Sequence, residues 1–424
     1  KKEHFGTRAT ATYDKSGTTT ATMKNWGLLR SSRPTNPFTS STTVSTGFTY
    51  NLDGTGVDII VIDSGVESGH PEFAVNPDGS GGSRVVDFNW ASLGVPGTPT
   101  GASIGGYLGD SDGHGSNCAS IAAGNTCGWA SGAAIYSLRI FPDYNIMGGG
   151  YLGAINSDVA FDIVKQFHLT KGTAGNVRPT ICTNSWGYRS TYSGMTATVY
   201  RGVTYLGSST SSSRGQVNYL HPYVVNYLDV SATSCSNAGV ILVGAAGNYL
   251  HKIDVPGGLD YDNYYTGWYG TTYYHRGSSP TRADGFINVG AIDNTTTEQK
   301  VNFSETGPRV DVYSPGTMIM GAYANKPYQT YAVPDPRNTS YHLNKISGTS
   351  QATPNVTGML ATVLQARPAM TPAEAKQFVV DHSIKNALVE GSNTTYSSTT
   401  YLQGGNNRIL QTPFTSPNRG GISS

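Results

Sequence analysis

The chain has 424 residues, 13% of them charged, and a formal net charge of +1. This length is compatible with two or three domains of about 150 residues, or with one large α/β domain that carries insertions. The small charge, without long runs of either sign, argues against a surface for nucleic acid or an anionic membrane, and no apolar run reaches the roughly 18 residues of a membrane span.

The N-terminal segment, residues 1–25, is polar, rich in Thr and Gly, and without periodicity. We expect an extension without regular structure there. Its basic start lacks the apolar stretch of a signal peptide, so either the protein is not exported by that route or a leader has been removed. The globular pattern begins near Trp26 and is predicted to end at residue 390, before a polar tail over 391–424.

Short apolar strands alternate with helices through the predicted domain. The strands are 57–63, 133–140, 179–187, 239–248, 286–293 and 309–316, and the helices are 118–124, 154–168, 359–366 and 371–383. The last helix opens with Thr-Pro and Glu, which is a typical helix start. This alternation predicts an α/β fold with three layers, α/β/α, around a mainly parallel central sheet.

Two long segments, about 188–230 and 249–281, interrupt the alternation. We expect both to be insertions carried on loops. The second, which is rich in Tyr, is interpreted as a surface loop, with a sugar-binding platform as the alternative. Its aspartates Asp254, Asp260 and Asp262 could hold a structural calcium ion, because hard cations prefer carboxylate oxygens. The alternative is that they are solvated loop charges.

Polar side chains stand where several predicted elements end or begin. Asp63 follows VDIIVI, Ser185 follows TICTN, and Asn248 follows VILVGAAG. His114 in DGHGSNCAS and Ser350 in SGTSQATP stand where helices of small residues begin. Because ligands of open parallel sheets bind beyond the carboxyl ends of the strands, these side chains are candidates for one site.

Taken singly, each of these residues has an ordinary structural explanation. The Asp and the Ser are typical caps, the Asn a turn residue, and the His a residue of a surface loop. Together they supply the groups that a serine peptidase requires. Ser350 would attack a carbonyl, His114 would take its proton, Asp63 would orient the imidazole, and Asn248 would donate to the oxyanion.

The surrounding motifs resemble those of the subtilases, the subtilisin-like serine proteases. They are VIDSGV, DGHGSNCA, GAAGN and SGTSQATPNVTG, in the order typical of the family. Segments 25–32 and 55–73, together with Cys118, resemble the proteinase-K-like members, and the resemblance covers roughly 26–385. It implies a serine endopeptidase that forms an acyl-enzyme on Ser350 and uses no metal or organic cofactor in the bond chemistry.

The chain departs from the family's motifs beside the implied catalytic residues. Gln351 stands where the family usually has Met, Asn355 where it often has His, and Ser116 and Asn117 where Thr and His are usual. No member of the triad is lost, so these departures concern rate and specificity rather than reaction type. Pro354 is expected in the first turn of its helix, where no N–H partner is needed.

The resemblance also implies where a peptide substrate pairs as a strand. The implied residues are Ser185, Trp186 and Gly187 on one edge, Gly148, Gly149 and Gly150 on the other, and Tyr151 and Gly247 beside them. Glycines allow the close approach of another backbone. Trp186 and Tyr151 would line the substrate pocket that lies farther from the scissile bond, and they would favour bulky apolar substrate side chains there.

The four cysteines, Cys118, Cys127, Cys182 and Cys235, lack the spacing of a zinc site. They could form one or two disulfides, or stay free and buried. We interpret Cys118 as a packed small residue; if it lies beneath the imidazole, mercurials should inhibit. Many subtilases hold calcium just after the histidine helix, but GNTCGWASG has no carboxylate, so that site is predicted to be absent.

Three hypotheses follow from these patterns. The first is a secreted endopeptidase that acts on polypeptides after removal of a prosegment, since residues 1–25 are too short and polar to be one. The second is an extracellular or particle-associated structural protein whose subtilase domain serves self-processing or limited cleavage, as the low charge and polar termini suggest. The third is a pseudoenzyme scaffold, against which the intact triad argues. The oligomeric state is left open.

Overall fold

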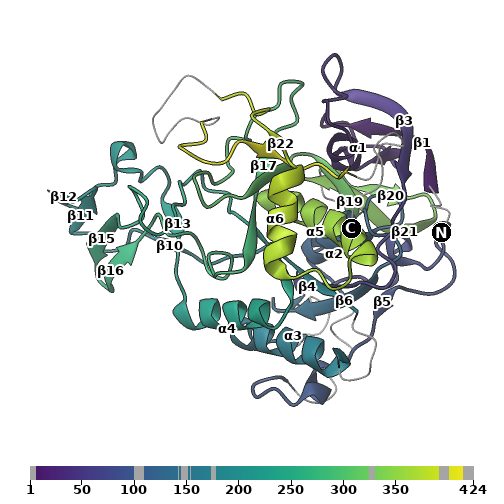
Figure 1. Cartoon of the computed structure of the whole chain (residues 1–424), viewed down its shortest axis with the longest axis horizontal. Coiled ribbons are helices and arrows are strands. Elements are labelled where there is room, and N and C mark those ends of the chain that lie inside the picture. Colours follow the sequence, from purple (N-terminus) through teal and green to yellow (C-terminus); the bar gives the residue numbers. More distant parts are fainter. Residues whose placement is uncertain are drawn as a thin grey trace.

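The computed structural model describes residues 6–99, 109–141, 143–144, 151–152, 154–172, 178–323, 330–390 and 401–413. Its α-helices are α1 (Trp26–Ser31), α2 (His114–Ala123), α3 (Ser157–Gly172), α4 (Asn226–Asn237), α5 (Thr349–Ala366) and α6 (Pro372–His382). Short 3₁₀ helices cover Pro71–Phe73, Trp90–Leu93 and Ser212–Arg214. Figure 1 shows how these elements are arranged.

A nine-stranded sheet forms the centre of the molecule. Its order is β22 (Ile384–Lys385), β23 (Arg408–Ile409), β18 (Val312–Pro315), β17 (Phe286–Ile292), β14 (Ile241–Ala245), β9 (Thr180–Asn184), β4 (Asp58–Asp63), β6 (Ala134–Arg139) and β5 (Val85–Val86). Every neighbouring pair is parallel except β22 with β23. The prediction of a mainly parallel sheet is therefore confirmed.

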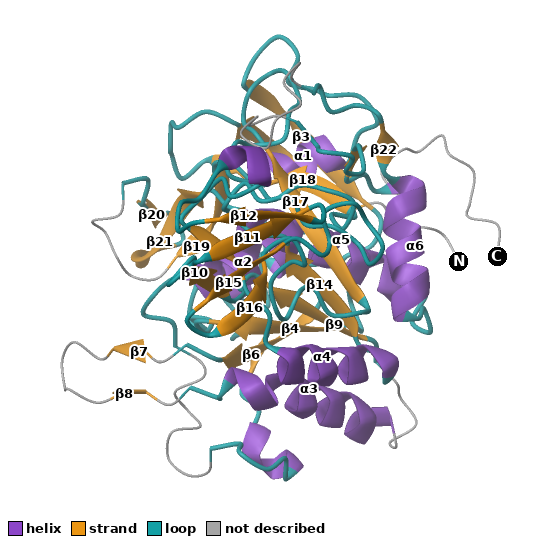
Figure 2. Ribbon diagram, turned by 90° about the vertical axis from the view of Figure 1, so that its left-hand side faces the viewer, coloured by secondary structure: helices purple, strands orange, loops and turns teal. Residues whose placement is uncertain are grey.

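Helices cover both faces of this sheet. In β4, Ile59 and Val61 enter one apolar core and Ile60 and Ile62 enter the other, because successive side chains of a strand point to opposite faces. The first core includes residues of α2 and α5, and the second includes residues of α3 and α4. Figure 2 shows α3 and α4 side by side on one side of the sheet, so the three predicted layers are present.

The N-terminal segment differs from the predicted irregular extension. β1 (Gly6–Asp14) pairs with β2 (Met23–Lys24) and with β3 (Thr43–Tyr50) in a three-stranded sheet. Tyr13 and Lys15 are buried, and the Lys15 ammonium lies 4.5 Å from the centre of the Trp26 ring. The Thr-rich sequence did not indicate this strand, because polar β-branched residues are compatible with a half-exposed sheet as well as with a loop.

The predicted C-terminal tail also differs from the structure. β23 adds Ile409 to the central sheet beside Tyr313 of β18, and Ile409 and Leu410 are fully buried. Residues 401–413 thus belong to the domain that was expected to end at 390. So short an apolar run cannot be distinguished from a loop by periodicity alone.

The two insertions pair with each other instead of forming separate loops. β11 (Ala197–Tyr200) and β12 (Val203–Leu206) come from the first, and β15 (Tyr264–Gly267) and β16 (Gly270–Tyr273) come from the second. They form one antiparallel sheet in the order β12-β11-β15-β16, which projects from the domain in Figure 1. We call it the insertion sheet.

A further three-stranded sheet leads into the helix that carries Ser350. It contains β19 (Ile319–Tyr323), β21 (Asn338–Ile346) and β20 (Val333–Asp335), in that order. The remaining strands form two-stranded pairs: β7 (Asp143–Tyr144) with β8 (Tyr151–Leu152), and β10 (Arg189–Thr191) with β13 (Leu220–Pro222). Within the described ranges, every helix is too short or too polar to cross a lipid bilayer.

Candidate active site

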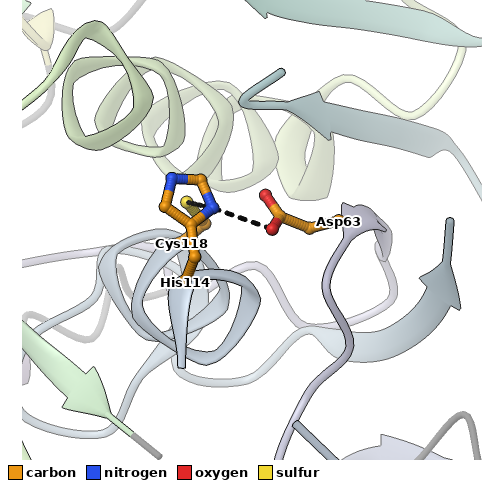
Figure 3. A group of neighbouring side chains, drawn as sticks. All are labelled: Asp63, His114 and Cys118. Carbon is orange, nitrogen blue, oxygen red and sulfur yellow. Dashed lines mark hydrogen bonds and ion pairs between the residues drawn. The ribbon is translucent and has the colours of Figure 1, made fainter. Parts of the chain in front are cut away.

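Asp63 and His114 form a hydrogen-bonded pair at the carboxyl end of β4. Asp63 is the last residue of that strand, and His114 is the first residue of α2. Nδ1 of the imidazole lies 2.8 Å from Oδ1 of the carboxylate. Figure 3 draws this hydrogen bond as a dashed line. Because an ionised carboxylate can only accept, Nδ1 donates, and in the neutral ring Nε2 then carries no proton. An imidazole in this tautomer can act as a base.

The electrostatics of the pair favour the protonated imidazole. Burial of the His114 ring is the largest single influence and lowers its pKa, but the Asp63 carboxylate and the Cys118 sulfur together raise the pKa well above its usual value. Asp63 is 1% exposed, and its Oδ2 has no hydrogen-bond partner among the residues that the structure describes. A carboxylate that is this poorly solvated is well suited to stabilise a neighbouring imidazolium.

A second carboxylate, Asp110, fixes the turn that leads into α2. Its Oδ1 accepts from Ser64 Oγ and from the backbone of Gly113, and its Oδ2 accepts from the backbone and hydroxyl of Ser116. Ser64 Oγ in turn accepts from the backbone N–H of Gly115. Asp110 therefore joins the segment after Asp63 to the start of the histidine helix. Sequence reasoning missed it, although an acidic residue just before a helix is a cap signal.

Cys118 lies between His114 and the helix of Ser350. Its Sγ is 4.0 Å from Nδ1 of His114 and 3.5 Å from the carbonyl oxygen of Ser350. Burial raises the pKa of the Cys118 thiol, so the sulfur stays protonated and packs as a small side chain, as expected. All four cysteines are buried and free.

The nucleophile candidate Ser350 is the second residue of α5. Its hydroxyl donates to the carbonyl oxygen of Ser185 at 3.0 Å, and the hydroxyl of Ser185 donates back to the carbonyl oxygen of Ser350 at 2.8 Å. At the start of a helix the Ser350 backbone N–H has no intrahelical partner, and the positive end of the helix dipole lies there.

Pro354 explains why the carbonyl of Ser350 bonds outside its helix. Pro354 lies in the second turn of α5, so the expectation that it occupies the first turn is wrong. Lacking an N–H, it cannot bond the carbonyl four residues earlier, which belongs to Ser350. That carbonyl accepts instead from Ser185 and Cys118. The proline thus frees an acceptor that ties α5 to β9 and α2.

Asn248 is held in one orientation by Thr349. Its Oδ1 accepts from the backbone N–H of Thr349 at 2.9 Å and from the Thr349 hydroxyl at 2.8 Å. The amide Nδ2 therefore points the other way, with its protons available to an incoming carbonyl. This arrangement matches the requirement for a preorganised oxyanion donor.

The unusual residues beside the nucleophile contact one another. Nε2 of Gln351 donates to Oδ1 of Asn117 at 3.2 Å, so two of the departures from the family motifs form one buried pair. Asn355, a third, accepts from Asn25 and from the indole N–H of Trp129. The polar groups of these three residues form hydrogen bonds within the protein, which makes the substitutions compatible with a buried helix.

Two cavities adjoin the candidate catalytic residues. One, of about 380 Å³, is lined by Asp63, Ser64, Asp112, His114, Phe141, Ser185 and Trp186. The other, of about 350 Å³, adjoins Ser350 and Asn248 and is lined further by Ser185, Trp186, Gly187, Gly247 and Glu305, among others. Trp186 borders both cavities and packs edge-on against Phe141, a wall residue that the sequence did not indicate.

The remaining substrate-binding candidates have different outcomes. Gly247 lines the second cavity, but its N–H donates to Thr349 and its carbonyl accepts from Glu305. Its N–H is therefore occupied within the protein, and the residue shapes the wall of this cavity. Gly148, Gly149 and Gly150 lie outside the described residues, as does the side chain of Tyr151.

The aspartates considered for calcium are paired with basic side chains. Asp260 contacts Arg201 and Lys252, and Lys252 also contacts Asp254. Asp262 is mostly exposed and pairs separately with Arg276. Cations of the chain already neutralise these carboxylates, and the three do not converge on one point. The residues therefore do not fit a calcium site.

Comparison with known proteins finds relatives among the serine proteinases. The extracellular serine proteinase of Thermus sp. (strain Rt41A) is 28% identical over 391 residues, covering 92% of this chain and 66% of the relative. Alkaline serine exoprotease A of Vibrio alginolyticus is 25% identical, covering 84% of this chain and 46% of the relative. The chain thus spans about half to two thirds of these curated relatives.

Solved structures show the same fold. A cold-adapted subtilisin-like serine proteinase superposes with a TM-score of 0.56 at 21% identity, covering 92% of this chain and 98% of the other. The model of the subtilase family matches residues 54–408, a range that contains Asp63, His114, Asn248 and Ser350. The chain therefore belongs to the subtilase family and has its subtilisin-like fold.

Proposed function

We propose that the protein is a serine endopeptidase. The observation that carries this proposal is the Asp63–His114 hydrogen bond beside a helix N-terminus that presents Ser350. In the resting structure the Ser350 hydroxyl donates to Ser185. When a peptide binds, this hydroxyl turns to Nε2 of His114, which takes its proton as the oxygen attacks the scissile carbonyl.

The resulting oxyanion faces two donors. They are Nδ2 of Asn248 and the backbone N–H of Ser350, which the start of α5 leaves without an intrahelical partner. The imidazolium of His114, stabilised by Asp63, then protonates the leaving amine and leaves an acyl-enzyme on Ser350. Attack of water, with His114 again as the base, releases the second product and restores the hydroxyl.

The alternative, a structural or particle-associated protein with limited self-processing, has less support. The matched relatives are described as proteinases, and the hydrogen-bonded pair and the oriented Asn248 have geometry suited to turnover. Polypeptide substrates follow from membership of the family. We further propose that the protein acts outside the cell, because relatives are named extracellular and exoprotease.

Labelling of the active serine tests this function. We expect a fluorophosphonate probe to label the wild-type chain and not Ser350→Ala, with kcat/KM on an unfolded protein substrate falling by more than about 10³-fold in the variant. Ser347→Ala, which alters a neighbouring hydroxyl outside the helix, serves as the matched control and should keep labelling. A folded wild-type chain that neither labels nor cleaves would favour the structural alternative.

A further inference from the structure

A buried carboxyl group lies in the wall of the cavity beside the nucleophile. Glu305 is 1% exposed and lines the 350 Å³ cavity together with Ser350 and Asn248. Its backbone N–H donates to the carbonyl of Gly247. A Cβ on Gly247 would come within 2.6 Å of Glu305 Cγ, so the glycine leaves room for this side chain beneath the wall.

The position of the cavity identifies the substrate residue that enters it. Asn248 and Ser350 supply the oxyanion donors and the nucleophile, and both meet the carbonyl of the residue before the scissile bond. A cavity that adjoins both is therefore nearest to the side chain of that residue. This step rests on the proposed peptidase function.

The carboxyl of Glu305 lacks a full set of partners inside the protein. Its Oε2 is buried and makes no hydrogen bond within the described residues. Burial raises the pKa of Glu305 well above its usual value, opposed by the nearby Lys300 and by the backbone of His251. Lys300 is itself occupied, because its ammonium donates to the carbonyls of Val301 and Ser304. An unpaired buried carboxyl oxygen is costly unless a ligand supplies the missing donor.

A second charged residue lines the same cavity on the solvent side. Arg189 is exposed, and its guanidinium stacks on the Tyr249 ring with 5.2 Å between the guanidinium carbon and the ring centre. Water screens an exposed cation much more than a buried carboxyl. The titratable group that an entering side chain meets at depth is therefore the Glu305 carboxyl, while Arg189 lies at the rim.

We propose that Glu305 determines specificity by binding a cationic side chain, lysine or arginine, in the residue before the scissile bond. The ammonium or guanidinium donates to the Glu305 carboxylate, and any proton on the carboxyl passes to solvent as the ion pair forms. A charge-assisted hydrogen bond of this kind typically changes an equilibrium or a rate by about 10- to 100-fold. Small apolar wall residues such as Ala245 and Ala246 leave space for the aliphatic stem.

Peptides that differ only in charge at this position test the proposal. A fluorogenic series carries lysine, N-acetyl-lysine, arginine, citrulline, leucine or glutamate before the cut, and rates are normalised to the fluorophosphonate-labelled fraction. We expect kcat/KM for lysine over N-acetyl-lysine, and for arginine over citrulline, to be at least about 10-fold. Glu305→Gln, which keeps the shape, should reduce both ratios to below about threefold while the rate for leucine changes little.

Control variants separate this role from a general loss of structure. Asp262→Asn removes an exposed carboxylate of the second insertion and should leave both ratios unchanged. Equal losses for all six peptides in Glu305→Gln, or unchanged ratios, would overturn the proposal. A preference for glutamate would assign specificity to Arg189 instead and would also overturn it.

Binding measurements keep the inference separate from the proposed function. Ser350→Ala is titrated by calorimetry with product-like peptides that end in lysine or in N-acetyl-lysine. Tighter binding of the lysine peptide, lost on adding Glu305→Gln, supports the assignment even if the wild-type chain fails to cleave. Equal affinity for the two peptides contradicts it even if cleavage is efficient.

Discussion

Buried aspartates have different kinds of partner at the carboxyl edge of the central sheet and in the insertions. At the edge, Asp63 contacts a partly exposed imidazole, and one of its oxygens has no hydrogen-bond partner within the described part of the chain. In the second insertion, Asp260 is fully buried between Arg201 and Lys252. The first carboxylate has a partner whose charge can change during a reaction, whereas the second is held between an arginine and a lysine side chain.

Histidines show the same contrast. The pKa of His114 is held well above its usual value by the Asp63 carboxylate. Burial instead lowers the pKa of His251 to about 3 and that of His275 to about 4. An imidazole beside a lone carboxylate can gain and lose a proton during a reaction, but one buried among backbone carbonyls stays neutral. Burial and partners, rather than residue type, therefore separate reactive groups from structural ones.

The largest expected effect comes from the carboxylate at the sheet edge. Asp63→Asn should lower kcat by about 10⁴-fold, because the amide no longer fixes the reactive tautomer or stabilises the imidazolium. Wild-type kcat/KM should fall as pH decreases through the raised pKa of His114, since only the neutral ring is a base. In the variant this acidic limb should move to lower pH. A pH–rate profile measures both, and an unmoved limb would contradict the assigned pairing.

The corresponding Asp-to-Asn substitution in the second insertion should lower the stability of the fold rather than the activity. Asp260→Asn leaves Arg201 and Lys252 without a buried anion that they share, and breaking a buried pair costs about 3 kcal/mol or more. Urea unfolding measures the loss. Activity per labelled active site should change by less than about threefold. An equally large loss of kcat would show that the insertions take part in the chemistry.

Two leucine substitutions test how well the central sheet and the insertion sheet are packed. Leu242 of β14 is fully buried, whereas Leu206 of β12 is 88% exposed. Leu242→Ala should lower the free energy of unfolding by about 2–5 kcal/mol, because it removes apolar contacts and leaves a cavity. Leu206→Ala should change it by less than about 0.5 kcal/mol. Similar losses in the same denaturation assay would mean that the insertion sheet is covered in solution.

The smallest effect is a change in the pH dependence of stability. The unfolded chain protonates His251 below about pH 6.5, while the folded chain keeps it neutral down to about pH 3. The unfolded state thus binds more protons in this window, and stability falls as pH decreases, by up to about 1.4 kcal/mol per pH unit. His251→Gln should reduce this slope between pH 6 and 5. An unchanged slope would assign acid sensitivity to other groups.

Prediction from the sequence was most successful where local pattern and burial coincide. The apolar runs of β4, β9 and β14 are buried on both faces, so their composition alone indicated a parallel sheet. It was least successful for β1 and the insertion sheet. The strands of that sheet alternate weakly, and β11 pairs with β15, more than 60 residues away. Such pairing depends on contacts that no local window contains.

The sequence by itself determined which chemical groups the protein carries and at which strand ends and helix starts they stand. Short motifs suffice for this, because a turn after a buried strand and the first turn of a helix are local structures. Only the tertiary structure decided which groups act on one another. It joined Gln351 to Asn117, used Pro354 to free the Ser350 carbonyl, paired the candidate calcium ligands with Lys252 and Arg201, and buried Glu305 in the cavity wall. These relations depend on distances across the fold and on the exclusion of water, and both are set by packing between distant segments.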